Sequence, residues 1–309
     1  MRERVWLMAV LVAMGAGWGS TQVLSRIVVS EGYRHLGVVF WQLVLSGGIL
    51  GAICLIRGKG LPFERRHLIL YLVIALIGTV LPNSASYEAA RHLPAGILSL
   101  VLATVPMFAF PIALAWGIDR FSVARLAGLL IGLVGVALIA LPEASLPDPA
   151  MVLFLPLALL GPFFYGIEGN YVARFGTEGL DPVQVLFGAS VIGVLIAGPV
   201  AVATGSWVSP LPPWGAPDYA LMITSVIHAM VYSSYVWLVG RAGAVFASQV
   251  SYLVTGFGIL WAILLLGESY SGYVWGALAL MFLGLFLVQP RKRAPLAPDA
   301  PLGETGRQA

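Results

Sequence analysis

The chain has 309 residues, of which 59% are hydrophobic and 10% charged, with a mean hydropathy of +0.92 and a formal net charge of +3. Soluble domains carry about 25% charged residues, so this composition excludes an ordinary soluble domain and indicates an integral membrane protein. The apolar runs are continuous and do not alternate over about ten residues, which favours helices over barrel strands. We therefore expect an all-α integral membrane protein.

The chain starts with a basic segment, Met1 to Arg4, and an apolar stretch, as a secretory signal peptide does. Because the apolar run continues to Val29, we expect an uncleaved first span. The single cysteine, Cys54, lies inside an apolar run, so neither an intrachain disulfide nor a multi-cysteine metal site is expected.

Ten segments are apolar and long enough to cross a bilayer, which takes about 20 residues. Residues 290–309, with several prolines, are expected to form a disordered cytoplasmic tail. The expected spans are Val5–Val29, Leu36–Ile56, Leu68–Ala90, Ala95–Trp116, Val123–Leu141, Met151–Ala173, Pro182–Ala203, Tyr219–Val239, Ala244–Leu266 and Tyr273–Gln289.

Basic residues in the short loops predict the orientation, since they collect on the cytoplasmic side. With the amino terminus inside, the outer loops hold only Arg26, Arg34 and Arg91, and the other basic residues of the loops and ends face the cytoplasm. We therefore expect a multi-pass protein of the cell inner (cytoplasmic) membrane with both termini in the cytoplasm.

The chain repeats its layout after about 149 residues. Ala244 to Leu266 leads through Gly267-Glu268-Ser269 into the last span, and Ala95 to Trp116 leads through Gly117 to Arg120 into the fifth. The acidic break at a fixed place between two spans supports a repeat more strongly than the apolar matches do. Because each half has five spans, the second would enter the membrane from the opposite side, which is the inverted arrangement of many secondary transporters.

Four features together resemble the EamA-type members of the drug/metabolite transporter superfamily. They are Trp18-Gly19 with Arg26 in the first span, Tyr87 to Gly96 before the fourth, Pro106 within it, and the Gly267-Glu268 turn. The likeness covers Val5 to Val288. The first half departs from the pattern at Ile118-Asp119, where Gly-Glu is usual, and Thr255 stands where the second copy would carry proline.

This resemblance implies two inverted five-helix repeats, residues 1–145 and 146–289, around a central cavity. It implies that the first, third, fourth, sixth, eighth and ninth helices line the cavity. It also implies export or exchange of small metabolites such as amino acids.

Polar residues at membrane depth are the candidates for the site, since they are costly there and usually face a bundle interior or a watery cavity. In the eighth span, His228 shares a helix face with Thr224, Tyr232 and Tyr235. This stripe suits a substrate cavity, and the alternative is a histidine that only bonds a neighbouring helix.

The third span carries a matching stripe, Thr79, Asn83 and Tyr87. Its position in the repeat suggests that both stripes face the same space. Pro82, beside Asn83, would bend the helix or free a carbonyl group, which membrane helices tolerate beside a cavity or a neighbouring helix. A purely structural kink is the alternative.

Glu168 in the sixth span, flanked by Tyr165 and Tyr171, is a candidate for proton coupling because a desolvated, unpaired carboxyl group binds protons readily. The alternative is an ion pair with Arg174 or Arg241.

For the other candidates, a structural role is an alternative to lining the cavity. For Glu88 we expect an ion pair with Arg91 and His92. For Glu268 we expect a favourable interaction with the dipole of the last helix. The remaining candidate lining residues are Trp18, Gln22, Ser99, Ala103, Pro106, Gln249, Tyr252 and Thr255.

The function that we expect is secondary transport of small amphipathic or amino-acid-like solutes, by an exporter or exchanger that is a monomer or a homodimer. The partners would be the substrate and the lipid bilayer, with no nucleic acid, cofactor or metal, and proton coupling is one option. An intramembrane enzyme is disfavoured because Ser190 lacks an evident base and the four histidines are scattered. A membrane scaffold would leave the polar stripes without a purpose. No Gly-x-x-x-x-Gly-Lys loop occurs, which disfavours ATP-driven pumping.

Overall fold

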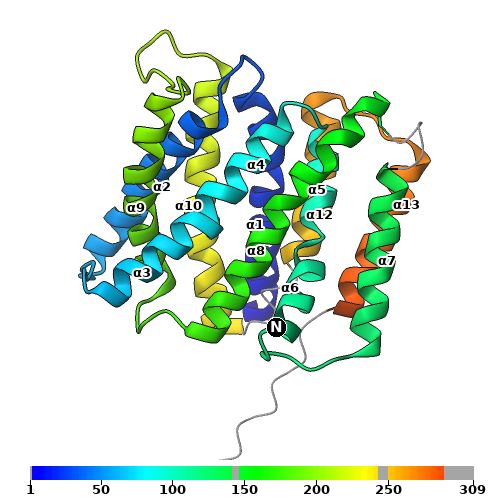
Figure 1. Ribbon diagram of the computed structural model, residues 1–309, viewed down its shortest axis with the longest axis horizontal. Helices are drawn as coiled ribbons and strands as arrows, with labels where there is room; N and C mark the ends of the chain where they lie inside the picture. The colour runs from blue at the N-terminus through cyan, green and yellow to red at the C-terminus, as the bar shows by residue number, and fades with distance from the viewer. Residues whose placement is uncertain (1, 141–145, 243–249, 289–309) are drawn as a thin grey trace, which may run out of the picture.

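The computed structural model describes residues 2–140, 146–242 and 250–288, and within them the regular structure is helical, with no strand (Figure 1). The helices are α1 (Arg2–Val28), α2 (His35–Ile56), α3 (Arg65–Ile74), the π-helix η1 (Ala75–Val80), α4 (Leu81–Ala90), α5 (Ala95–Leu102), α6 (Val105–Ala115), α7 (Val123–Ala140), the 3-10 helix η2 (Pro149–Phe154), α8 (Leu155–Phe175), α9 (Pro182–Ala203), α10 (Ala216–Ala242), α12 (Val250–Leu266) and α13 (Gly272–Val288).

These helices correspond to the segments expected to cross the membrane. Residues 141, 244–249 and 289 of those segments, and the expected tail at 290–309, lie outside the described residues. In the described ranges, 7 helical segments are long and apolar enough to do so, and Val250–Leu266 and Gly272–Leu287 are shorter apolar helices. The eighth expected segment lies within α10, a helix of 27 residues. The prediction of an all-helical membrane protein is confirmed, and the count of ten spans stays a prediction.

Two expected spans are interrupted, each beside a proline. The π-helix η1 comes directly before Pro82, whose ring would clash with the carbonyl group four residues earlier in a regular helix. Between α5 and α6 the helix breaks just before Pro106, where the Thr104 hydroxyl group donates to the carbonyl oxygen of Val101 at 2.6 Å. A π-helical turn frequently marks a functional position.

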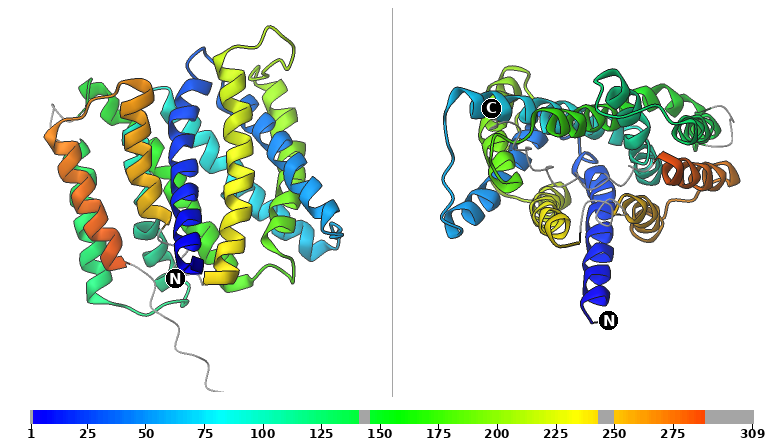
Figure 2. Two further views of the ribbon diagram at one scale, coloured as in Figure 1. Left: turned by 180° about the vertical axis from the view of Figure 1, so that it is seen from behind. Right: turned by 90° about the horizontal axis from the view of Figure 1, so that it is seen from below.

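The helices pack in pairs that combine the two parts of the chain. α2 packs on α9 at one edge of the molecule, and α7 packs on α13 at the other (Figure 1). Seen from behind, α12, α1 and α10 stand side by side with α1 in the middle (Figure 2). On the other face, α8 contacts both α4 and α6.

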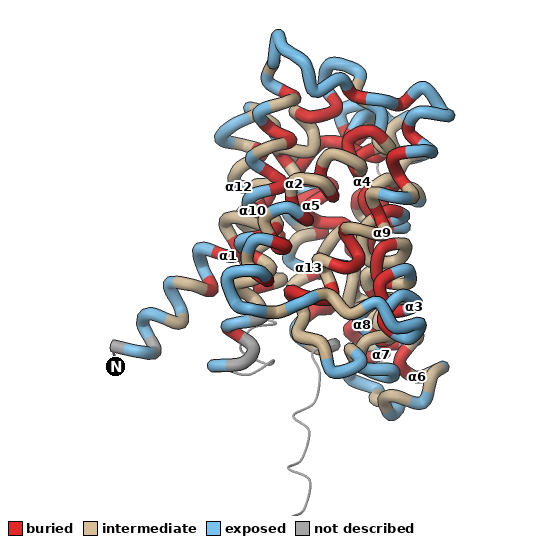
Figure 3. The backbone as a smooth tube through the Cα atoms, turned by 90° about the vertical axis from the view of Figure 1, so that its left-hand side faces the viewer, coloured by how far each residue is buried: buried red, intermediate tan, exposed pale blue. Residues whose placement is uncertain are grey.

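Buried residues gather in the interior of the bundle, and exposed ones lie on its ends and its rim (Figure 3). The N-terminal turns of α1 lean away from the other helices (Figures 2 and 3). Trp6 there is 61% exposed, and Glu3 pairs with Arg241 of α10 at 2.9 Å. Many large apolar side chains are exposed on the sides of the bundle, as a lipid-facing surface requires.

Asp181 joins the α2–α3 loop to the start of α9. It accepts hydrogen bonds from the backbone N–H groups of Val183 and Gln184, and its carboxylate pairs with Lys59 and Arg57. Burial works against the ionised form, but the hydrogen bonds and the two cations outweigh it and lower the pKa of Asp181. The interaction therefore stabilises the fold at neutral pH and is lost as the pH falls through that lowered pKa.

At the upper end, Glu268 caps a helix far away in the sequence. Its carboxylate oxygens accept from the backbone N–H groups of Ala95 at 2.8 Å and Gly96 at 3.2 Å, and the Tyr270 hydroxyl group also donates to it. Sequence analysis expected Glu268 to act on the dipole of α13, the helix that follows it. The structure shows that it satisfies the free N–H groups at the start of α5 instead.

Replacing Glu268 with alanine should lower the midpoint of thermal unfolding in detergent, because it leaves two N–H groups of α5 without their acceptor. Helix caps contribute about 1–2 kcal/mol. The control is Glu64→Ala, which removes an exposed ion pair with Arg66 and should change the midpoint little. Equal midpoints for the two variants would contradict this role of Glu268.

Candidate substrate site

A chain of hydrogen bonds between buried polar side chains crosses the interior of the bundle. The Tyr165 hydroxyl group of α8 donates to Asn83 Oδ1 of α4 at 2.8 Å. Asn83 Nδ2 and the Tyr87 hydroxyl group both donate to Gln42 Oε1 of α2, at 3.2 and 3.1 Å. Gln42, Asn83 and Tyr87 are each less than 10% exposed. Three helices are thereby held in register by polar groups that would be costly to leave unpaired.

A small cavity lies beside this chain. Gln42, Ser46, Thr79, Ser190 and His228 supply its polar lining, and leucine side chains supply the remainder. Its volume of about 20 Å³ is room for roughly one water molecule. The lining comes from α2, η1, α9 and α10, so helices from both parts of the chain meet here.

The carboxyl group of Glu168 lies against Gly78 in the π-helical turn of the third expected span. A Cβ atom added at Gly78 would overlap this carboxyl group. Glu168 is half-buried and has no hydrogen bond or ion pair with any residue that the structure describes. The hydroxyl groups of Tyr165 and Tyr232 lie within electrostatic range of its charge. It is therefore a carboxyl group without a partner among the described residues, with two tyrosines in its neighbourhood.

The alternative of an ion pair for Glu168 does not agree with the structure. Arg174 donates a hydrogen bond to the carbonyl oxygen of Trp116, and its guanidinium group lies over the ring of Phe175. Arg241 pairs with Glu3.

His228 lies among aromatic side chains. The centroid of the Trp18 ring of α1 is 6.5 Å from that of His228 and 5.8 Å from that of Tyr235. Like Glu168, His228 has no hydrogen bond to the described part of the chain. The structure therefore brings Trp18, His228 and Tyr235 together, with Thr79 on the cavity wall beside His228.

Several expected lining residues lie elsewhere. Ser99 is fully buried, bonds the carbonyl oxygen of Ala95 and packs on Gly258 of α12. The ring centroid of Tyr252 is 5.7 Å from that of Phe282 of α13. Gln22 is half-buried on α1 and is not among the residues that line the cavity, and Gln249 lies outside the described residues.

The expected ion pairs of Glu88 are present. Arg91 approaches its carboxylate at 3.3 Å and His92 at 3.6 Å, and His35 of α2 joins them at 3.2 Å. Arg26 donates instead to the carbonyl oxygen of Ala90, which makes it an anchor for the end of α4.

The contribution of α2 and α9 to the cavity was not predicted from the sequence. Gln42 receives two hydrogen bonds, Ser46 donates to the carbonyl oxygen of Ser225 at 3.1 Å, and Ser190 of α9 lines the cavity. The sequence held a signal, because Gln42 is the only amide side chain in the segment Leu36–Ile56, and amides at membrane depth bond neighbouring helices.

Comparison with known proteins identifies the family of this chain. Residues 5–141 and 153–289 each match the EamA-like transporter family. The chain belongs to this family. Two relatives are the "Uncharacterized inner membrane transporter YedA" of Escherichia coli strain K12 and the "Uncharacterized transporter YvbV" of Bacillus subtilis strain 168. The first is 26% identical over 93% of this chain and 92% of its own length, and the second 23% identical over 98% and 96%.

A solved crystal structure has the same fold, with a TM-score of 0.60 and 16% identity over 91% of this chain and 97% of that one. The chain is thus an EamA-type membrane transporter. In the part of this transporter that the structure describes, no group of three or more His, Cys, Asp or Glu residues could hold a metal ion. What the site offers a solute is hydroxyl and amide groups, aromatic rings, one carboxyl group and one imidazole.

Replacing Gln42 with methionine should lower the unfolding midpoint, because Asn83 and Tyr87 lose their shared acceptor. A buried donor without a partner costs about 1–3 kcal/mol. Tyr87→Phe should lower the unfolding midpoint less in the Gln42→Met background than in the wild-type chain. The Tyr87 hydroxyl group that Gln42→Met leaves unpaired is then removed.

The control is Gln22→Met, which replaces an amide that makes no hydrogen bond in the described part of the chain. If Gln22→Met lowers the midpoint as much as Gln42→Met, or if the effects of Gln42→Met and Tyr87→Phe are fully additive, Gln42 is not the shared acceptor of Asn83 and Tyr87.

Proposed function

We propose that this EamA-type transporter is a secondary transporter that moves small amphipathic or amino-acid-like metabolites across the cytoplasmic membrane. In this proposal, ten spans form two inverted halves, residues 1–145 and 146–289, which expose a midplane site to each side in turn. Both termini lie in the cytoplasm, and the chain works as an exporter or exchanger. Intramembrane enzymes and scaffolds are the competing classes.

The pattern of helix contacts supports two related halves. α2 and α9 hold the second place in their halves, α7 and α13 hold the fifth, and each pair is in contact. The contact of α1 with α10 has its counterpart in the contact of α8 with α4. The contact of α1 with α12 corresponds in the same way to that of α8 with α6. The two separate matches to one family, over residues 5–141 and 153–289, agree with this correspondence between the helix contacts of the two halves.

The observation that carries the proposal is the half-buried carboxyl group of Glu168, which has no hydrogen bond or ion pair in the described part of the chain. A carboxylate that is partly withdrawn from water and has no partner is costly, so such a group is retained for a task rather than for stability. Asn83 bonds Tyr165 and Gln42, and His228 lines the same small cavity as Gln42 with its ring 6.5 Å from that of Trp18. This lining suits a small molecule with both an apolar and a polar part, and it suits a proton as the coupling ion.

An enzyme is less well supported. Ser190 and His228 line one cavity but are not joined by a hydrogen bond, so the pairing of a nucleophile with its base is not formed. A scaffold would not need an unpaired carboxyl group at this depth.

Replacing Asn83 or His228 with alanine should reduce flux about tenfold, which corresponds to losing one hydrogen bond of about 1.4 kcal/mol to the solute. Flux is measured in reconstituted vesicles, after a panel of amino acids and other amphipathic metabolites has identified a transported compound. The controls are Leu81→Ala and Met230→Ala, which alter exposed side chains on the same helices. Unchanged flux in both Asn83 and His228 variants would remove these residues from the site.

Proton coupling is tested at Glu168. Glu168→Gln should abolish the effect of a pH gradient on uptake but retain solute exchange, because the amide keeps the shape and cannot exchange a proton. Gly78→Ala should impair the same response by displacing the carboxyl group, whereas Gly169→Ala, on the helix of Glu168 with open space at its Cβ position, should not. An undiminished response of Glu168→Gln to the gradient would reject this role.

A further inference from the structure

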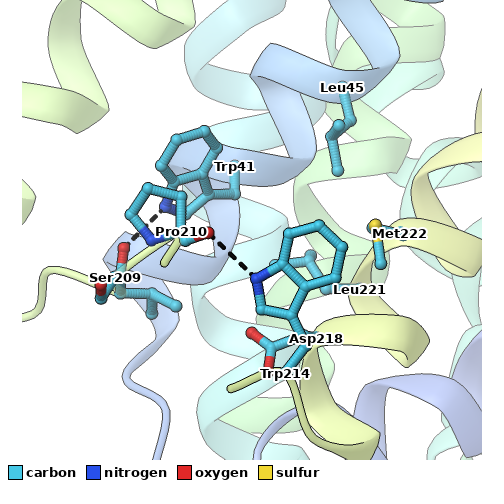
Figure 4. A pocket seen from close by; sticks show the side chains of 9 residues that line it. Trp41, Leu45, Ser209, Pro210, Trp214, Asp218, Leu221 and Met222 are labelled. Carbon is cyan, nitrogen blue, oxygen red and sulfur yellow. Dashed lines mark hydrogen bonds between the residues drawn. The ribbon is translucent and has the colours of Figure 1, made fainter. Parts of the chain in front are cut away.

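A second, larger pocket lies at the upper end of the molecule, beneath the connection between α9 and α10. We call it the loop pocket, and it is formed by Trp41 and Leu45 of α2, Pro210 and Trp214 of the connection, and Leu221 and Met222 of α10 (Figure 4). Its volume is about 210 Å³, and it shares no residue with the buried cavity beside Gln42. It is a separate site.

The two indole N–H groups at the loop pocket are already paired within the protein. The indole N–H of Trp41 donates to the carbonyl oxygen of Val208 at 2.9 Å, and that of Trp214 donates to Pro210 at 3.0 Å. Figure 4 shows Trp41 and Pro210 on one side of the pocket, with Leu45 and Met222 on the other. Because both indole N–H groups are used, the rings offer a ligand their carbon surface only.

Asp218 brings a negative charge to the rim, and its two oxygens are also occupied. They accept from the Tyr33 hydroxyl group and from the backbone N–H of Gly215, each at 2.8 Å. Burial, followed by the hydrogen bond and charge of Asp218, raises the pKa of Tyr33 to about 12, so Tyr33 keeps its proton at neutral pH and remains a donor to Asp218. The rim therefore disfavours an anionic ligand.

We propose that the loop pocket binds the flat apolar ring of a neutral or cationic amphipathic solute. A dry apolar cavity of about 150 Å³ is enough to bind benzene, so about 210 Å³ accommodates a single or a fused ring. The indole faces stack on such rings. One wall of the pocket is the non-helical connection with Ser209 and Pro210, which lies between the end of α9 and the start of α10.

Binding here would also link the two parts of the chain. α2 supplies Trp41 and Leu45, and α10 with its preceding connection supplies the other walls. A ligand that contacts both favours the arrangement in which these walls face each other. The binding itself does not depend on the function proposed above, and it is tested without transport.

The test measures how fast a water-soluble maleimide labels a cysteine in the pocket wall of the detergent-solubilised full-length chain. Met222→Cys places the thiol there, and the only native cysteine, Cys54, is 2% exposed. Indole serves as the neutral fused-ring probe. At ten times its Kd, indole should slow labelling of Met222→Cys roughly tenfold. Leu45→Cys, which lies on the same side of the pocket but on α2, provides the same test if Met222→Cys does not fold.

The control is Leu211→Cys, in the same connection but 72% exposed and outside the pocket lining, where indole should not change the rate. Indole-3-acetate, which carries the same ring with a negative charge, should protect Met222→Cys less well than indole.

Three results would overturn the proposal. One is that indole leaves the pocket cysteines unprotected. Another is equal slowing at Leu211→Cys, which would place the effect on the reagent or the micelle. The last is protection by added phospholipid with no further effect of indole, which would show that an acyl chain fills the pocket.

Discussion

The side-chain amide of Gln42 is the interaction on which the interior of this transporter depends. A bilayer supplies no water to satisfy polar groups, so each buried one must find a partner in the protein. Gln42 accepts hydrogen bonds from Asn83 and Tyr87, and Asn83 in turn accepts one from Tyr165. This chain fixes α2, α4 and α8 relative to one another. It thereby positions the cavity beside it and the face of α8 that carries Glu168.

The amides and tyrosines satisfy one another, whereas Glu168 and His228 have no hydrogen bonds in the described part of the chain. The π-helical turn contributes to this, since Gly78 has no side chain and the carboxyl group can lie directly on its backbone. An ionised carboxyl group here would need a counter-charge, and no Lys or Arg side chain of the described residues supplies one. In the proposed mechanism, a proton or the bound solute fills that need.

Much of the fold follows from the sequence because continuous apolar runs have few solutions in a membrane. The distortion of the third span was predictable from Pro82. Thr79 and Asn83, which were expected to share a face of that span, do face the interior. Contacts between helices distant in the sequence were not predictable in this way. Glu268 lies near the start of α13, and nothing in its local sequence shows that it caps α5. Gln42 was visible as a lone amide, but its partners depend on how α2 and α4 pack.

The packing also limits which parts of the molecule could move as rigid units. Gly15 and Gly19 let α1 approach α12 closely, and Gly17 does the same toward α10. In the other half, Gly161 and Gly166 let α8 approach α4 and α6. The first helix of each half is therefore packed mainly against the opposite half. A rocking motion must carry α1 together with α10 and α12, and α8 together with α4 and α6, or else break these close contacts. Close contacts at glycines are lost as soon as the helices separate, so helices joined by them are expected to move together. The rigid units of the proposed transport cycle therefore need not coincide with the two sequence repeats.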